Sequence, residues 1–152
     1  MIGNLYLQKN RFSGSIPNSL GSCVSLRKIN MAKNFLRGTI PVSLGSLPTL
    51  ISLNLSENQL SGQIPKSLSN LKLNLLDFLN NQLTGAIPDS LSLDAYKGSF
   101  AGNNGFCSKN IKNFHRCYDE SGKPKEWYTL LIYIMVAFIM VLISFVGYLN
   151  LK

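Results

Sequence analysis

The sequence predicts a solenoid of short parallel strands joined by irregular or 3-10 segments, because one phrase recurs four times in register. Each copy places two apolar residues two positions apart, an asparagine three positions after the second, and a Gly-x-Ile-Pro run beyond it. The steps between the four asparagines are 24, 24 and 23 residues. These asparagines are Asn10, Asn34, Asn58 and Asn81.

Each position of the phrase has a physical role. Leu5 and Leu7 alternate with Tyr6 and Gln8, which is typical of a short strand with one buried face. An asparagine side chain has donors and an acceptor, so stacked copies at the strand ends are expected to form a ladder that satisfies backbone groups. Because a single coil cannot bury its own apolar face, neighbouring coils must stack. The period and pattern are those of a leucine-rich repeat.

Changes in composition predict the limits of the domains. We expect four repeats of period 23–24 over residues 1–93, a C-terminal cap over 94–118 and a polar linker over 119–126. An uncharged helix then covers 127–149, and a cytoplasmic stub covers 150–152. The start carries neither a signal peptide nor a polar end cap for the solenoid, so we expect the chain to be a fragment that lacks upstream coils.

The uncharged segment 127–149 predicts a single transmembrane helix. As a helix it is about 34 Å long, enough for a hydrocarbon core of about 30 Å. Basic residues gather before this segment, with Lys152 after it, and the positive-inside rule alone would place the repeats in the cytoplasm. A disulfide and a glycosylation sequon favour the opposite orientation, with extracellular repeats at the plasma membrane. The alternative is a tail-anchored protein with cytosolic repeats.

The cysteines favour a structural role. Cys107 and Cys117 lie ten positions apart, and a disulfide between them would hold the cap with about 2–3 kcal/mol and imply an oxidising compartment. The competing interpretation is a metal site that adds His115, but it has only three ligands and no CxxC spacing, so we expect no metal. Cys23 occupies a slot that leucines fill in later coils and is predicted to be a core residue.

Solvent-facing strand positions are the candidate partner surface. The first two coils are basic there and the last two neutral to acidic, which fits either a ligand surface or an ordinary solvated face. The sequon Asn54-Leu55-Ser56 is the candidate glycosylation site. The possible partner face consists of Tyr6, Gln8, Lys28, Asn30, Lys33, Glu57 and Asp77.

Charge and motifs exclude several classes of function. The net charge is +8, from 15 lysines and arginines against 7 acidic residues, but the basic residues are scattered and no nucleic-acid-binding motif is present. No motif places a catalytic group, a cofactor site or an element of a kinase domain. We therefore expect a chain that binds and does not catalyse.

The LxLxxNxLxGxIP phrase, the Gly-Asn-x-Gly-Phe-Cys string that ends at Cys107 and the second cysteine resemble a plant leucine-rich-repeat receptor-like kinase. The strings Leu20–Leu26, Leu73–Pro88 and Ala95–Phe100 are most similar to the Haiku and Haesa-like group. The resemblance implies an extracellular horseshoe that binds a peptide ligand, meets a co-receptor ectodomain and signals through a cytoplasmic Ser/Thr kinase. That kinase is missing from this chain.

Two hypotheses of function follow. The first is the membrane-proximal ectodomain and membrane span of such a receptor. The second is a kinase-less, tail-anchored scaffold or decoy with cytosolic repeats. A disulfide between Cys107 and Cys117 and a glycan on Asn54 would favour the first, because cytosolic sequons stay unmodified.

Overall fold

The computed structural model describes residues 2–118 and 127–150, with the side chains of the helix described over 129–142. The chain divides into two compact units, Met1–Arg116 and Cys117–Lys152. The predicted linker, 119–126, and residues 151–152 of the predicted stub lie outside the described residues.

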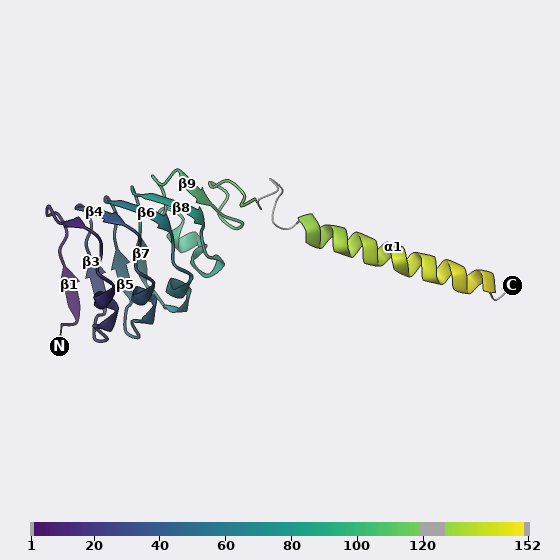
Figure 1. The fold of residues 1–152 in the computed structure, drawn as a ribbon, viewed down its shortest axis with the longest axis horizontal. Helices are drawn as coiled ribbons and strands as arrows, with labels where there is room; N and C mark the ends of the chain where they lie inside the picture. Colours follow the sequence, from purple (N-terminus) through teal and green to yellow (C-terminus); the bar gives the residue numbers. More distant parts are fainter. Residues whose placement is uncertain (1, 119–126, 151–152) are drawn as a thin grey trace. The chain divides into compact units, whose positions relative to one another are not determined.

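The first sheet of the repeat unit has four parallel strands that follow one another in chain order. They lie side by side along the solenoid (Figure 1). Equivalent positions of the phrase are register partners, so that Leu5, Ile29, Leu53 and Leu76 form one row. The strands are β1 (Asn4–Tyr6), β3 (Lys28–Asn30), β5 (Ser52–Asn54) and β7 (Leu75–Asp77).

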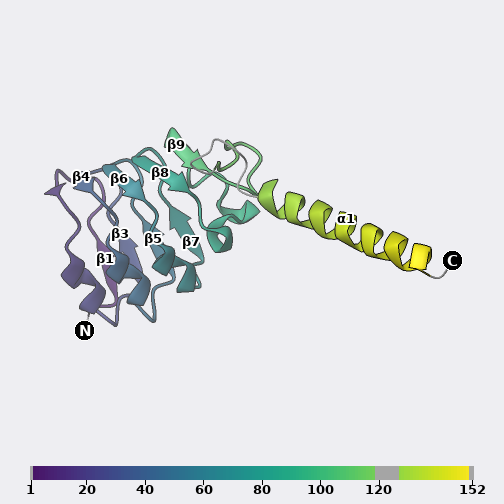
Figure 2. The same ribbon diagram turned by 45° about the vertical axis from the view of Figure 1, so that its right-hand side comes forward.

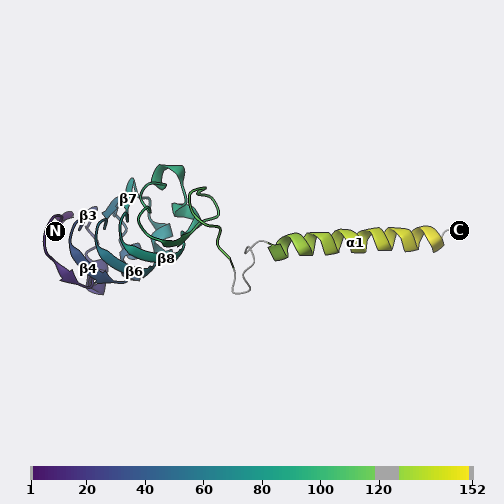
Figure 3. The same cartoon turned by 90° about the horizontal axis from the view of Figure 1, so that it is seen from above.

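A second row of short parallel strands runs along another edge of the coils. Figure 2 shows β4, β6, β8 and β9 in succession along this edge. Viewed from above, the coils stack one behind the next (Figure 3). The strands are β2 (Ser13–Gly14), β4 (Phe35–Gly38), β6 (Gln59–Gln63), β8 (Gln82–Ala86) and β9 (Gly105–Cys107).

Short 3-10 helices close each coil after its proline. At each of the first three, the proline has an extended backbone and its carbonyl accepts a bond from the amide three residues later, as from Leu20 to Pro17. Proline suits this position because its own nitrogen has no hydrogen to donate. The helices are η1 (Asn18–Ser22), η2 (Val42–Ser46), η3 (Lys66–Asn70), η4 (Asp89–Leu91) and η5 (Asp94–Tyr96).

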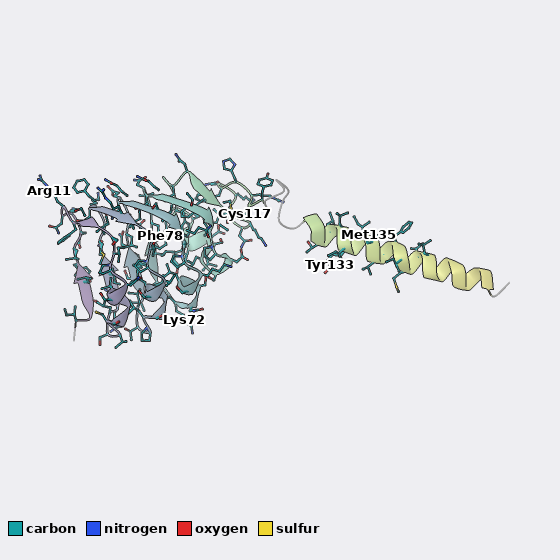
Figure 4. All side chains as sticks on the ribbon, viewed as in Figure 1. Arg11, Lys72, Phe78, Cys117, Tyr133 and Met135 are labelled. Atoms are coloured by element: carbon teal, nitrogen blue, oxygen red, sulfur yellow. The ribbon has the colours of Figure 1, made fainter. Side chains whose placement is uncertain are left out.

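The core is one continuous column of apolar side chains inside the coils. Leu53, Leu55, Leu60 and Leu68 of the third coil are completely buried, as the phrase predicts. Phe78 lies in the same column and is labelled in Figure 4. Because each coil is covered by its neighbours, burial is highest in the middle of the stack.

The coil pattern continues past Leu93, where the sequence analysis ended the repeats. The amides of Phe78 and Asn80 donate to the carbonyls of Ser99 and Ala101, so the 99–101 segment follows β7 as a fifth strand would. On the other edge, β9 pairs with β8 in parallel. The predicted cap thus begins with a further coil of the same construction.

Two predictions fail at the level of the fold. Helix α1 (Trp127–Asn150) is present, but nowhere in the described part of the chain does a helix have the length and apolar character needed to cross a membrane. This finding contradicts the predicted transmembrane helix over 127–149. Cys23 was predicted to be a core residue, but it is exposed.

Candidate functional site

The exposed face of the first sheet carries a row of polar side chains across four coils. Strand register aligns Tyr6 with Asn30, Asn30 with Asn54, and Asn54 with Asp77. With strands about 4.8 Å apart, this row extends over about 14 Å. Tyr6 is 55% exposed and the other three are partly buried, so the row forms a polar surface on a rigid scaffold.

Local hydrogen bonds fix the orientation of three members of the row. The Oδ1 atoms of Asn30, Asn54 and Asp77 each accept a bond from the backbone amide two residues later, at 3.0–3.1 Å. These bonds occupy the acceptor atom of each asparagine. Among the described residues, the amide nitrogens of Asn30 and Asn54 have no protein partner, so both remain available as donors.

A hollow of about 400 Å³ lies over this row. Lys28 and Ser52 line one part of it, and Ile51 and Leu75 give it an apolar side. Lys28 is the only charged side chain among its described lining residues. The complete lining is Tyr6, Lys28, Asn30, Ile51, Ser52, Asn54, Asn74 and Leu75.

The turn after each strand holds a second row of exposed side chains. In the first coil this row begins at Lys9, next to the exposed Gln8. Lys9, Lys33, Glu57 and Asn80 all have positive φ, between 53° and 58°, in the left-handed region that non-glycine residues seldom adopt. Lys33 and Glu57 form an ion pair at 3.0 Å with both side chains about half exposed. This exposed row includes Lys33 and Glu57 of the predicted partner face.

Charge is distributed unevenly along the repeats. The sequence has no acidic residue before Glu57, whereas residues 1–56 hold six basic residues. Asp77 places a carboxylate at the fourth coil. The six basic residues are Lys9, Arg11, Arg27, Lys28, Lys33 and Arg37, and Figure 4 labels Arg11 at the N-terminal part of the solenoid.

The predicted asparagine ladder serves the interior of the stack and not the exposed face. Nδ2 of Asn58 donates to the carbonyls of Met31, Leu55 and Ser56 at 3.0–3.1 Å, and its Oδ1 accepts from the amide of Leu36. Asn34 and Asn81 make the same four types of bond. Asn10 is exposed, and its Nδ2 donates only within its own coil.

A fifth ladder asparagine, Asn103, escaped the sequence analysis. It donates to the carbonyls of Phe78, Phe100 and Ala101, and accepts from the amide of Leu83. The available signal was Phe100-x-x-Asn103, which repeats the spacing of Phe78 and Asn81 after 22 residues. The missing strand leucine and the glycine-rich context concealed it.

The cap contains a chain of aromatic contacts and the disulfide cysteines. Phe78, Phe100, Phe106 and Phe114 form three consecutive edge-to-face pairs with ring centroids 5.8–6.3 Å apart. Cys107 and Cys117 are each disulfide-bonded, and Cys23 is free. In the described part of the chain, no group of three metal-ligating side chains comes together.

The Leucine Rich Repeat family matches residues 2–23, 25–47 and 49–71. The ectodomain of the Arabidopsis receptor kinase HAESA, solved with the peptide hormone IDA and the co-receptor SERK1, is 46% identical, with a TM-score of 0.67. This match covers 69% of the present chain but only 18% of the HAESA chain.

Two shorter Arabidopsis thaliana ectodomain structures are also similar. A chain of the BIR3–SERK2 complex is 38% identical over 76% of this chain and 60% of its own length, with a TM-score of 0.67. The BIR2 ectodomain is 32% identical over 70% of this chain and 69% of its own length, with a TM-score of 0.56. No curated protein sequence matches this chain at a significant level.

Proposed function

Because this chain belongs to the leucine-rich-repeat family, we propose that it is the binding part of a plant receptor ectodomain. Its partner is a peptide ligand, a co-receptor ectodomain or both. The exposed face of β1, β3, β5 and β7 forms the contact. The observation that carries the proposal is the row from Tyr6 to Asp77, which presents polar groups in register on a rigid sheet.

The similar structures support the choice of partner. HAESA was solved with a peptide hormone and SERK1, and BIR3 with SERK2. The match to HAESA covers 18% of that ectodomain chain, so the complete ligand site of such a receptor extends beyond the matched region. Within the group, we place the chain nearest the Haesa-like receptors on the three sequence strings quoted above.

We place the repeats outside the cell. The disulfide-bonded state of Cys107 and Cys117 supports this location, since structural disulfides persist in oxidising compartments. The test is thiol labelling in intact plant cells: both cysteines should react only after reduction. Rapid labelling without a reductant would contradict the extracellular location.

Binding can be tested with the 152-residue chain produced in the bacterial periplasm, where disulfides form and Asn54 stays unglycosylated. The immobilised chain is titrated with the SERK1 ectodomain, with and without IDA peptide. Tyr6 is the exposed aromatic side chain of the face. Tyr6→Ala should weaken binding about tenfold, because tyrosines that become buried by a partner are frequent binding hot spots.

The matched control is Val42→Ala, which removes an exposed apolar side chain from η2, outside the strand face. It should leave the affinity unchanged. Equal losses in the two variants, or no binding of SERK1 and IDA to the unmodified chain, would contradict the proposal.

Asn54 remains a predicted glycosylation site, and its position gives a second test. Its side chain lines the hollow, so a glycan on its amide nitrogen would cover the contact surface. Chain secreted from a eukaryotic host should bind more weakly than periplasmic chain if Asn54 is modified. Asn54→Gln, secreted from the same host, should remove that difference.

A further inference from the structure

Resting on the proposed function, the hollow over the first sheet also indicates what kind of peptide it accepts. Among its described lining residues, Lys28 alone is charged, and several polar side chains beside it have hydrogens that no protein acceptor occupies. In the described part of the chain, they are the hydroxyls of Tyr6 and Ser52 and the amide nitrogens of Asn30, Asn54 and Asn74. A site with one cation and several donors is suited to an anionic acceptor, above all a carboxylate.

The charge of the first two coils agrees with this preference. The first two coils carry six basic residues and no acidic residue. Lys33 is paired with Glu57, which lies at the turn, away from the hollow lining. In the described part of the chain, no ion pair is formed by Lys28, so its charge is available to a ligand.

The apolar side of the hollow indicates that the peptide has an apolar side chain near that carboxylate. Leu75 is 45% exposed and lies in the same register row as Lys28, two strands away, with Ser52 between them. Ile51 joins it from the adjacent coil. Residues i and i+2 of an extended peptide point to the same face and lie about 6.7 Å apart. The side chain of Lys28 is long enough to reach residue i while residue i+2 contacts Ile51 and Leu75.

We propose that the hollow binds an extended peptide segment with the pattern acidic-x-apolar, the acidic side chain on Lys28 and the apolar one on Ile51 and Leu75. The polar row continues to Asp77 on one side of the hollow, and β1 continues to Asn4 on the other. A peptide therefore passes across the site, and the carboxylate comes from a side chain within it and not from its C-terminus.

The test uses the whole oxidised chain and blocked, fluorescein-labelled peptides that differ at one position. The probe is Ser-Glu-Ser-Leu-Ser-amide with fluorescein on its N-terminal amine, compared with versions in which glutamine replaces the glutamate or serine replaces the leucine. Fluorescence polarisation should give at least about fivefold weaker binding for the glutamine probe, and this preference should shrink as salt is raised.

Variants then assign the preference to the hollow. Lys28→Gln should abolish the discrimination between the glutamate and glutamine probes, and Leu75→Ser should abolish that between leucine and serine. Lys66→Gln, an exposed lysine on η3, is the matched control and should change neither. Circular dichroism melting of each variant verifies that the fold is retained.

Several outcomes would overturn the inference. One is no preference for glutamate, and another is a preference that survives Lys28→Gln. A third is equal, Lys28-dependent binding of a peptide whose only carboxylate is its free C-terminus, which would show that the site takes a chain end. If SERK1 and IDA still bind in a Tyr6-dependent manner in these cases, only the peptide class is wrong. If they also fail to bind, the proposed function is wrong as well.

Discussion

The first coil and the coil that contains Asn103 use related sequences, yet they differ in how well they are packed. In the first, Phe12 is 47% exposed and Asn10 makes two bonds within its own coil. In the last, Phe100 is completely buried and Asn103 makes four bonds to two coils. Asn10 and Asn103 hold the same place in the phrase, so the comparison shows that a repeat residue gains buried bonds from the preceding coil and not from the motif itself.

The largest expected effect comes from removing one aromatic side chain from the first coil and one from the last. Phe100→Ala should lower the free energy of unfolding by about 3–5 kcal/mol, because the ring is buried between Phe78 and Phe106. Phe12→Ala should cost about 1 kcal/mol or less, because half of that ring is already in water. Chemical denaturation followed by circular dichroism measures both. Equal losses would show that the two ends are packed alike.

The next test compares ladder asparagines. Asn81→Ala should destabilise the chain by about 2–3 kcal/mol, because it leaves the buried amide of Leu60 without an acceptor. It also removes one of the two asparagine donors from each of the carbonyls of Leu55 and Phe78. Asn10→Ala should cost less than about 1 kcal/mol, since the groups it bonds can turn to water. Asn103→Ala should resemble Asn81→Ala. A small effect at Asn103 would mean that the last coil covers the core but contributes little to the free energy of unfolding.

Gly21 is an exception to the looser packing of the first coil. The backbone of Gly21, in η1 of the first coil, is so close to the second that an added Cβ would lie 2.5 Å from Ser43. Gly45 of η2 has the same contact with Ser67. The 3-10 side of the first coil is therefore as tight as the interior, although its strand side is open. Gly21→Ala and Gly45→Ala should both cost about 1–3 kcal/mol.

The control for that pair is Gly98→Ala, because nothing lies within 4 Å of its added Cβ. Its melting temperature should be unchanged or slightly higher, since alanine restricts the unfolded chain. If Gly21→Ala proved as mild as this control, the first coil would be loose on both sides.

Repetition made the solenoid predictable. A pattern that recurs in register reports its own period, so the strand rows and the buried leucines followed from the sequence. Asn103 was missed because the last coil replaces the strand leucines with Gly98 and Phe100, and the motif was sought in its complete form. Cys23 was placed in the core by analogy with Leu47, which is completely buried, but Cys23 is exposed, as is Val24 beside it.

The partner face was predictable in position but not in detail. Alternation along each strand indicated which side chains point outward. It gave no sign that Oδ1 of Asn30 and Asn54 would be occupied by local amides, which turns these residues into donors. The left-handed backbone at Lys9, Lys33 and Glu57 was equally hidden, because glycine, the usual residue for that conformation, is absent there.

The smallest expected effect concerns these turns. Lys33→Gln should cost no more than about 0.5 kcal/mol, because its ion pair with Glu57 is about half exposed and competes with water. The difference in the free energy of unfolding between Lys33→Gln and the unmodified chain should vanish near 1 M salt, where charges are screened within about 3 Å. Lys9→Gln is the first-coil counterpart without an acidic partner among the described residues, and it should cost nothing. A larger loss at Lys33 that persists in salt would show that its aliphatic stem packs against the sheet, and the turn row would then contribute to stability as the asparagine ladder does.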